Sequence, residues 1–270
     1  MGTSKSFTTP SGGAWTSVKS DVSDYVAGRG NITAPQIIAG TIRALKGLGV
    51  PASGRTTGSA AERSTGRTGG GGGGSAGGGG GSRAVGRATS GLAGFGAAFQ
   101  GGGLNAALQF LGLKELEGHP ASEVIARIAD HLAEGNDPTQ YELLNDALRS
   151  ALIEAAALQE AGAYADLEAA LQAYLDANGV EGLIQLFLSQ YVFDRVWMAV
   201  ENHAELKSQN ESTVQALSIA VGNACRSDVE ALIAEQKEAG QFENVDWFGK
   251  AGADLGNALV AELESRLRNA

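Results

Sequence analysis

The sequence is poor in the residues that most often build a disulfide framework or an active site: its 270 residues include one cysteine and three histidines. The single cysteine, Cys225, cannot form a disulfide within the chain, so nothing indicates an oxidising compartment. The amino terminus also lacks a basic segment followed by an apolar run, so we expect no secretory signal. Together these absences predict a cytoplasmic protein.

Catalytic and metal-binding patterns are missing as well. His119, His131 and His203 belong to no HExxH motif, and the chain has no CxxC motif. Cys225 lies in an alanine-rich helical pattern, where a lone cysteine is typical of a small core residue. The glycine runs contain no Gly-Lys-Ser/Thr, so they do not match a phosphate-binding loop. We therefore predict a protein that is not an enzyme and uses no cofactor or metal. The alternative is a hydrolase with His203 and Glu205 as its best candidates.

Glycine is the abundant residue, and it is concentrated in one part of the chain. Of the 40 glycines, 23 fall between Gly47 and Gly103. The Gly/Ser/Arg-rich range 52–90 predicts a disordered linker with an r.m.s. span of roughly 35 Å. The chain is then expected to comprise a flexible amino-terminal tail (1–13), a short helical segment (14–51), the linker (52–90) and a helical domain (91–270).

Charge is divided unevenly between the two ends of the chain. Residues 1–100 hold ten Lys/Arg and three Asp/Glu, whereas residues 101–270 hold ten Lys/Arg and 27 Asp/Glu. This asymmetry can indicate a basic arm that reaches an anionic partner. The favoured interpretation is that a solvated linker carries scattered arginines. Because the linker arginines are diluted by glycine rather than clustered, we expect no direct contact with nucleic acid.

One uncharged stretch, residues 88–113, is long enough to span a bilayer. It contains many glycines and the amide side chains Gln100, Asn105 and Gln109, which make its mean hydropathy too low for a good spanning helix. We expect this stretch to be the end of the linker as it passes into the first helix of the main domain. Membrane insertion is the less favoured interpretation.

Two short helices are predicted before the linker. In the range 15–27, apolar residues recur at helical spacing, beginning with Trp15 and Val18. A second helix follows Thr33, a good N-cap residue, with Pro35 in its first turn. Helices of this length are marginal alone, so they must pack on each other, on the carboxy-terminal domain or on a partner.

From Leu104 onward the apolar residues recur with a helical period. Local signals such as Asp137-Pro138 mark the residues at which helices begin. The expected helices lie near 104–116, 121–134, 138–161, 164–177, 180–208, 211–239 and 245–268. The predicted fold class is therefore all-α, with a carboxy-terminal helical bundle preceded by the Gly-rich linker and a short two-helix segment.

The amino terminus itself carries a chemically distinct group. Removal of the initiator methionine would leave the α-amine of Gly2 free, with a pKa of about 7.7–8.0 against about 10.4 for lysine. An unhindered amine of this kind is a sensible acceptor for covalent conjugation. The run Met1-Gly2-Thr3-Ser4-Lys5-Ser6 also fits the pattern for N-myristoylation.

The start of the chain resembles the QatB family of bacterial anti-phage proteins. The residues that carry the resemblance are Met1-Gly2-Thr3-Ser4, Ser6, Pro10, Gly12-Gly13 and Trp15. The plan of short amino-terminal segment, Gly/Ser-rich middle and helical carboxy-terminal domain is similar too. The resemblance implies a cytoplasmic component of a four-gene defence system whose other members are an ATPase, a QueC-like enzyme and a TatD-like nuclease.

The resemblance also implies a role for the tail. Gly2 would be modified by the QueC-like enzyme with a deazaguanine-type group, and Thr3, Ser4 and Trp15 would help the tail to dock. Two alternatives stay open. One is a membrane-associated effector that acts through an acylated amino terminus or the 88–113 segment. The other is a scaffold that bridges the ATPase and nuclease subunits.

Overall fold

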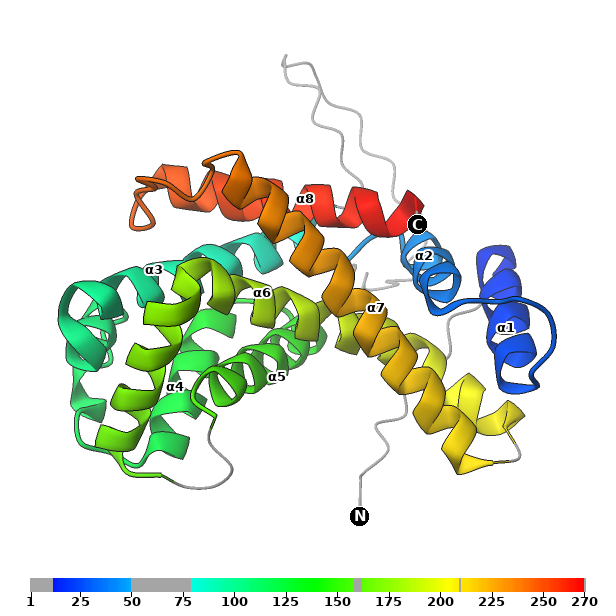
Figure 1. The fold of residues 1–270 in the computed structure, drawn as a ribbon, viewed down its shortest axis with the longest axis horizontal. Coiled ribbons are helices and arrows are strands. Elements are labelled where there is room, and N and C mark those ends of the chain that lie inside the picture. The colour runs from blue at the N-terminus through cyan, green and yellow to red at the C-terminus, as the bar shows by residue number, and fades with distance from the viewer. Residues whose placement is uncertain (1–11, 50–78, 158–161, 209, 270) are drawn as a thin grey trace, which may run out of the picture.

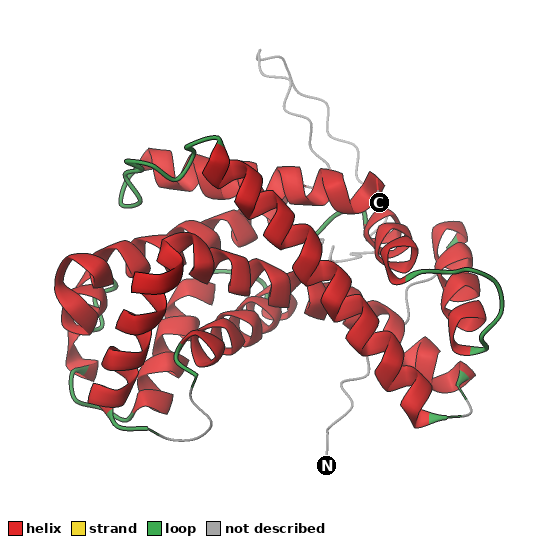
Figure 2. Ribbon diagram, viewed as in Figure 1, coloured by secondary structure: helices red, strands yellow, loops and turns green. Residues whose placement is uncertain are grey.

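The computed structural model describes residues 12–49, 79–157, 162–208 and 210–269. Within these ranges the chain is all-α, with no strand (Figure 2). The elements are α1 (Gly13–Val26), α2 (Ala34–Leu45), α3 (Gly79–Phe110), the 3-10 turn η1 (Lys114–Leu116), α4 (Ala121–Ala133), α5 (Pro138–Ala155), α6 (Tyr164–Lys207), α7 (Glu211–Glu238) and α8 (Lys250–Asn269). The prediction of an all-α fold is confirmed.

The two amino-terminal helices belong to the same hydrophobic core as the rest of the described chain. Trp15, Val18 and Val22 of α1 are buried, as are Ile37 and Ile42 of α2. Figure 1 shows α1 and α2 at one end of the molecule and α4 and α5 at the other, with α7 running obliquely between them. The structure shows α1 and α2 packed on each other and on the carboxy-terminal body, which are two of the three packing partners considered for these helices.

Local sequence signals set several helix starts. Thr33 caps α2, and its backbone N–H donates to Oε1 of Gln36 at 2.9 Å, which completes a capping box. Asp137 caps α5 by accepting a hydrogen bond from the N–H of Gln140 at 3.2 Å. Both predicted N-caps are therefore confirmed.

The predicted linker range 52–90 is wrong at its carboxy-terminal end, because residues 79–90 form the first turns of α3. Residues 52–78 lie outside the described chain. Burial explains the helix: Ala84, Val85 and Ala88 are at most 3% exposed. Glycine also permits close packing on α8, since a Cβ at Gly256 would lie 2.6 Å from the carbonyl oxygen of Gly86. Tertiary contacts thus outweigh the poor helix propensity of glycine.

Two predicted helix breaks are confirmed. The helices expected at 164–177 and 180–208 are the two halves of α6, which meet at the non-helical residue Gly179, where φ is +68°. The helix expected from Leu104 is the second half of α3, which follows the non-helical residues Gly102 and Gly103. This half ends at Phe110 rather than at residue 116, and η1 follows it. The last helix begins at Lys250 rather than at residue 245.

The uncharged stretch 88–113 lies almost wholly in α3, and most of its large side chains face the core, although Phe110 is 39% exposed. Leu92, Phe95, Phe99, Leu104 and Leu108 are fully buried. In the part of the chain that the structure covers, no helix has the length and apolar character needed to cross a membrane.

Candidate functional site

The predicted modification site begins outside the described chain. Gly2, Thr3 and Ser4 precede Gly12, the first residue that the structure describes, so their roles stay predictions. The structure does show where the tail joins the folded body: α1 begins at Gly13, directly after Gly12. The geometry of α1 therefore fixes the point from which the tail starts.

Helix α1 is held against α6 by an apolar stripe. The side chain of Trp15 is only 5% exposed, and Val18 and Val22 are 1% exposed. These side chains pack near Val200 of α6, and the crevice between them has no room for a water molecule. Docking of Trp15 on a partner stays a prediction. In the chain alone this side chain packs in the protein's own core.

A polar contact joins the same two helices. His203 on α6 lies 3.0 Å from the carbonyl oxygen of Lys19 and 3.0 Å from Oγ of Ser23, both through Nε2. The hydroxyl of Ser23 donates to the same Lys19 carbonyl at 2.7 Å. Because a carbonyl oxygen only accepts, the Nε2 atom of His203 must carry the proton in this contact.

That assignment decides what the Ser23–His203 pair can do. A serine is activated when an unprotonated imidazole nitrogen accepts its proton. Here the Nε2–H of His203 is a donor, and the Ser23 hydrogen already points to the Lys19 carbonyl. Burial lowers the pKa of His203, which favours the neutral ring. The contact ties α1 to α6 and does not form a nucleophile–base pair. Glu205, the other hydrolase candidate, has an exposed side chain on α6.

Cys225 is also unsuited to nucleophilic chemistry. Its side chain is fully buried in α7. Burial raises the pKa of its thiol well above the usual value, and the nearby Asp228 carboxylate raises it further. A thiolate is the reactive form, so this cysteine is a core residue, as its alanine-rich surroundings indicate.

The two ends of the glycine-rich segment meet at one place on the body. Oε2 of Glu264 on α8 accepts from the N–H of Leu48 at 3.1 Å and from the hydroxyl of Ser82 at 3.2 Å. A Cβ at Gly49 would lie 2.5 Å from the Cα of Gly81. We call this contact between Gly49 and Gly81 the junction. The residues that flank the glycine-rich segment on its two sides therefore lie together on one body, instead of belonging to two separate bodies.

Buried polar groups hold the junction from the other side. The carbonyl oxygen of Leu48 accepts from the hydroxyl of Tyr191 at 2.8 Å and from Nε of Arg195 at 3.2 Å. Arg195 also donates to the carbonyl of Gly49 at 3.3 Å, and Tyr191 accepts from Gln140 at 3.0 Å. Burial lowers the pKa of the Arg195 guanidinium. Each of these bonds satisfies a polar group that would otherwise be costly to bury.

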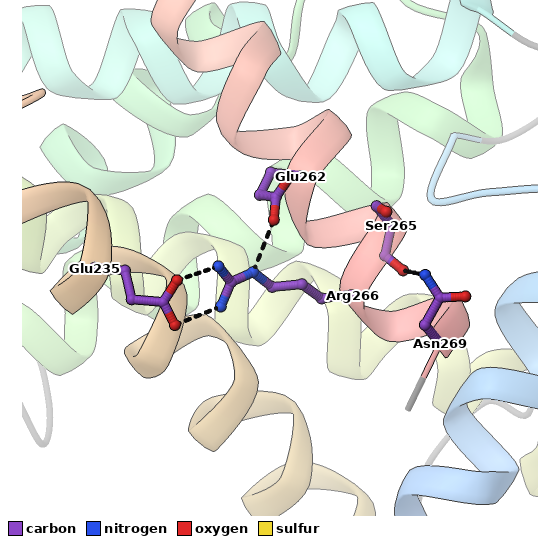
Figure 3. Close-up of polar contacts among 5 residues, drawn as sticks. All are labelled: Glu235, Glu262, Ser265, Arg266 and Asn269. Carbon is purple, nitrogen blue, oxygen red and sulfur yellow. Dashed lines mark hydrogen bonds and ion pairs between the residues drawn. The ribbon is translucent and has the colours of Figure 1, made fainter. Parts of the chain in front are cut away.

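One ion pair joins α8, which carries Glu264, to α7. Figure 3 shows the guanidinium of Arg266 donating to both carboxylate oxygens of Glu235 on α7, with a third hydrogen bond to Glu262 at 3.1 Å. These hydrogen bonds, with Glu235 foremost, raise the pKa of Arg266. Two residues further along α8, Arg268 pairs with Glu264 itself at 2.5 Å. A bidentate pair fixes geometry as well as adding energy.

Glu264 and Arg195 were not foreseen from the sequence. Their partners lie 216 and 147 residues away along the chain, at Leu48. No motif marks such distant pairs. The only sequence signal is that Arg195 occurs within the apolar aromatic stripe of α6, between Tyr191 and Trp197.

The fold and these contacts define an all-α protein with one core, a tail that precedes α1, and a glycine-rich segment whose ends lie side by side. The chain matches the family model for the Qat anti-phage system associated protein QatB over residues 70–245, which is more than half of its length. The chain therefore belongs to the QatB family and is a component of the Qat anti-phage defence system.

The matched range covers α3 to α7, so the helical body supports the family assignment independently of the tail residues that first suggested it. No curated protein and no solved structure matches the chain.

Proposed function

We propose that the chain acts in this system as a non-catalytic protein substrate. Its tail enters the active site of a QueC-like enzyme, and the α-amine of Gly2 receives a deazaguanine-type group there. The partner enzyme first joins a carboxyl carbon of that group to a phosphate-type leaving group taken from a nucleoside triphosphate. The amine lone pair then bonds to this carbon, the bond from the carbon to the leaving phosphate oxygen breaks, and the nitrogen loses a proton, which leaves an amide. The observation that carries this proposal is the position of α1, which fixes the tail to a rigid body at Gly12 and Gly13.

The length of the tail sets its reach. Residues 2–12 can extend over at most about 36–40 Å, since an extended chain covers about 3.3–3.6 Å per residue. That distance is enough to pass through a narrow channel into a buried site while the body stays outside. The small side chains of Thr3 and Ser4 suit such a channel. The reach therefore comes from the tail and not from the glycine-rich segment, whose ends are closed at the junction.

The state of the reactive side chains supports a non-catalytic role. Cys225 is buried with a raised pKa, and Nε2 of His203 is engaged as a donor in a contact between helices. Among the described residues, no group of three or more His, Cys, Asp or Glu side chains is placed to hold a metal ion. The α-amine of Gly2 is then the group of this chain best suited to covalent chemistry at neutral pH.

Peptide mapping by mass spectrometry tests the proposal. The chain is coexpressed with the other Qat proteins, and its amino-terminal peptide is compared with that of chain expressed alone. We expect added mass on Gly2, and loss of that mass when one residue is added before Gly2 or when Gly2→Pro is introduced. Lys5→Arg is the matched control, because it removes the nearest ε-amine and should leave the added mass in place.

Two results would contradict the proposal. One is an unmodified Gly2 in cells that contain the complete and active system. The other is added mass equal to a fatty acyl chain, which would favour the membrane-associated alternative instead.

A further inference from the structure

Four exposed basic side chains lie around the junction of a chain whose net charge is −10. Arg43 and Lys46 come from the end of α2, and Arg83 and Arg87 come from the start of α3. Lys46 lies two residues before Leu48 and Arg83 directly follows Ser82, and both Leu48 and Ser82 bind the same oxygen of Glu264. The chain segments that carry Lys46 and Arg83 therefore lie side by side, and we call these four basic residues the basic edge.

Nearby carboxylates do not neutralise this edge. Glu264 is engaged with Arg268 and with the two ends at the junction. Asp137 caps the start of α5. Among the described residues, Arg43, Lys46, Arg83 and Arg87 make no ion pair. The polar contacts of Arg43 and Arg87 are to neutral oxygens, the Arg268 carbonyl at 2.9 Å and Oδ1 of Asn136 at 3.0 Å.

Helix stability explains the positions of only two of the four residues of the basic edge. Arg43 and Lys46 lie at the carboxy-terminal end of α2, where cations favour the helix dipole. Arg83 and Arg87 lie near the amino-terminal end of α3, where cations gain nothing from the dipole. They are also four residues apart on one helix, where like charges repel at a cost of about 0.2–0.5 kcal/mol. An arrangement that helix stability opposes is typical of a surface used for binding.

We propose that the basic edge is a docking surface for an acidic face of another protein of the Qat system. A nucleic acid strand suits the surface less well, because it would extend from the edge over a body with 27 Asp/Glu against ten Lys/Arg in residues 101–270. A compact acidic face of a protein would contact the basic edge without extending over the acidic body. The proposal rests on family membership and is independent of modification at Gly2.

Binding measurements with the purified full-length chain test this surface. The chain is titrated against each of the other Qat proteins at low and at high salt. We expect at least one protein to bind in a salt-dependent way, and the double variant Lys46→Glu with Arg83→Glu to weaken that binding by about tenfold or more at low salt. Circular dichroism melting should show both proteins folded.

The matched control is Lys114→Glu with Arg149→Glu, which changes the charge equally at two exposed sites on the acidic body. The control should bind as the unaltered chain does. The proposal is overturned if both double variants lose equal affinity, if neither does, or if a single-stranded oligonucleotide binds the edge more tightly than any Qat protein. Variants at Gly2 should lose the added mass but keep this binding, so the two proposals fail separately.

Discussion

The fold largely buries the carboxyl group of Asp194, where water cannot solvate its negative charge well. It lies on α6, where Oδ1 accepts a hydrogen bond from Gln190 at 2.8 Å. Burial, with a further contribution from Asp146, raises the pKa of Asp194 to about 7. Between about pH 4 and pH 7 the folded chain therefore keeps a proton on Asp194, whereas the unfolded chain has already released it.

Stability should fall as pH rises through that window and level off above pH 7, because the unfolded state ionises first. Replacing Asp194 with asparagine removes this penalty. We expect Asp194→Asn to raise the free energy of unfolding at pH 8 by about 1–3 kcal/mol, with little gain at pH 4. Urea unfolding at the two pH values measures the difference. Asp146→Asn should give a smaller gain in the free energy of unfolding at pH 8. If Asp194→Asn gave the same gain at both pH values, the interpretation would be refuted.

At the scale of single elements, α6 bends because of one glycine. Gly179 has φ of +68°, a conformation that side chains other than glycine adopt only with strain. The bend lies next to the contact between Gly96 of α3 and Val180 and Leu183 of α6, where an added Cβ would be 3.2–3.3 Å from both. The bend therefore lies beside the close packing of α3 on α6.

Two alanine substitutions separate conformational strain from helix propensity. Gly179→Ala should lower the free energy of unfolding by about 1–2 kcal/mol, because alanine disfavours positive φ. Gly101→Ala, in α3 with nothing within 4 Å of the added Cβ, should raise it by about 0.5–1 kcal/mol. Thermal melts followed by circular dichroism provide the measurement. A neutral Gly179→Ala would show that the bend has another cause, and a destabilising Gly101→Ala would contradict the effect expected from helix propensity.

The elements also show which features a sequence alone can predict. The starts of α2 and α5 were predictable because their signals, Thr33 with Gln36 and Asp137 with Pro138, lie within a few residues. The start of α3 was not, because its helical state depends on packing against Gly256, far along the chain. The same holds for the site: Gly2 is marked by its chemistry, whereas the junction exists only once α2, α3 and α8 have met.

At the scale of the whole molecule, the closed junction makes the glycine-rich segment separable from the fold. Its ends are held by Glu264, Tyr191 and Arg195, and α1 and α2 pack in the common core. Replacing residues 50–78 with a short Gly/Ser bridge should therefore keep the fold. Stability should rise by about 1 kcal/mol, since a shorter loop costs less entropy to close. Denaturant unfolding and gel filtration test this, and a chain that fails to fold would contradict the closed junction.

The central claim is that a tail held by α1 delivers an amine to a partner, and one comparison of intact masses tests it most directly. Deleting residues 2–11 leaves Gly12 after the methionine, so the shortened chain still begins with a glycine amine but has lost its reach. Both chains are coexpressed with the complete Qat system and weighed by mass spectrometry. We expect added mass on the full-length chain and none on the shortened one. Equal added mass on both, or none on either, would contradict the claim.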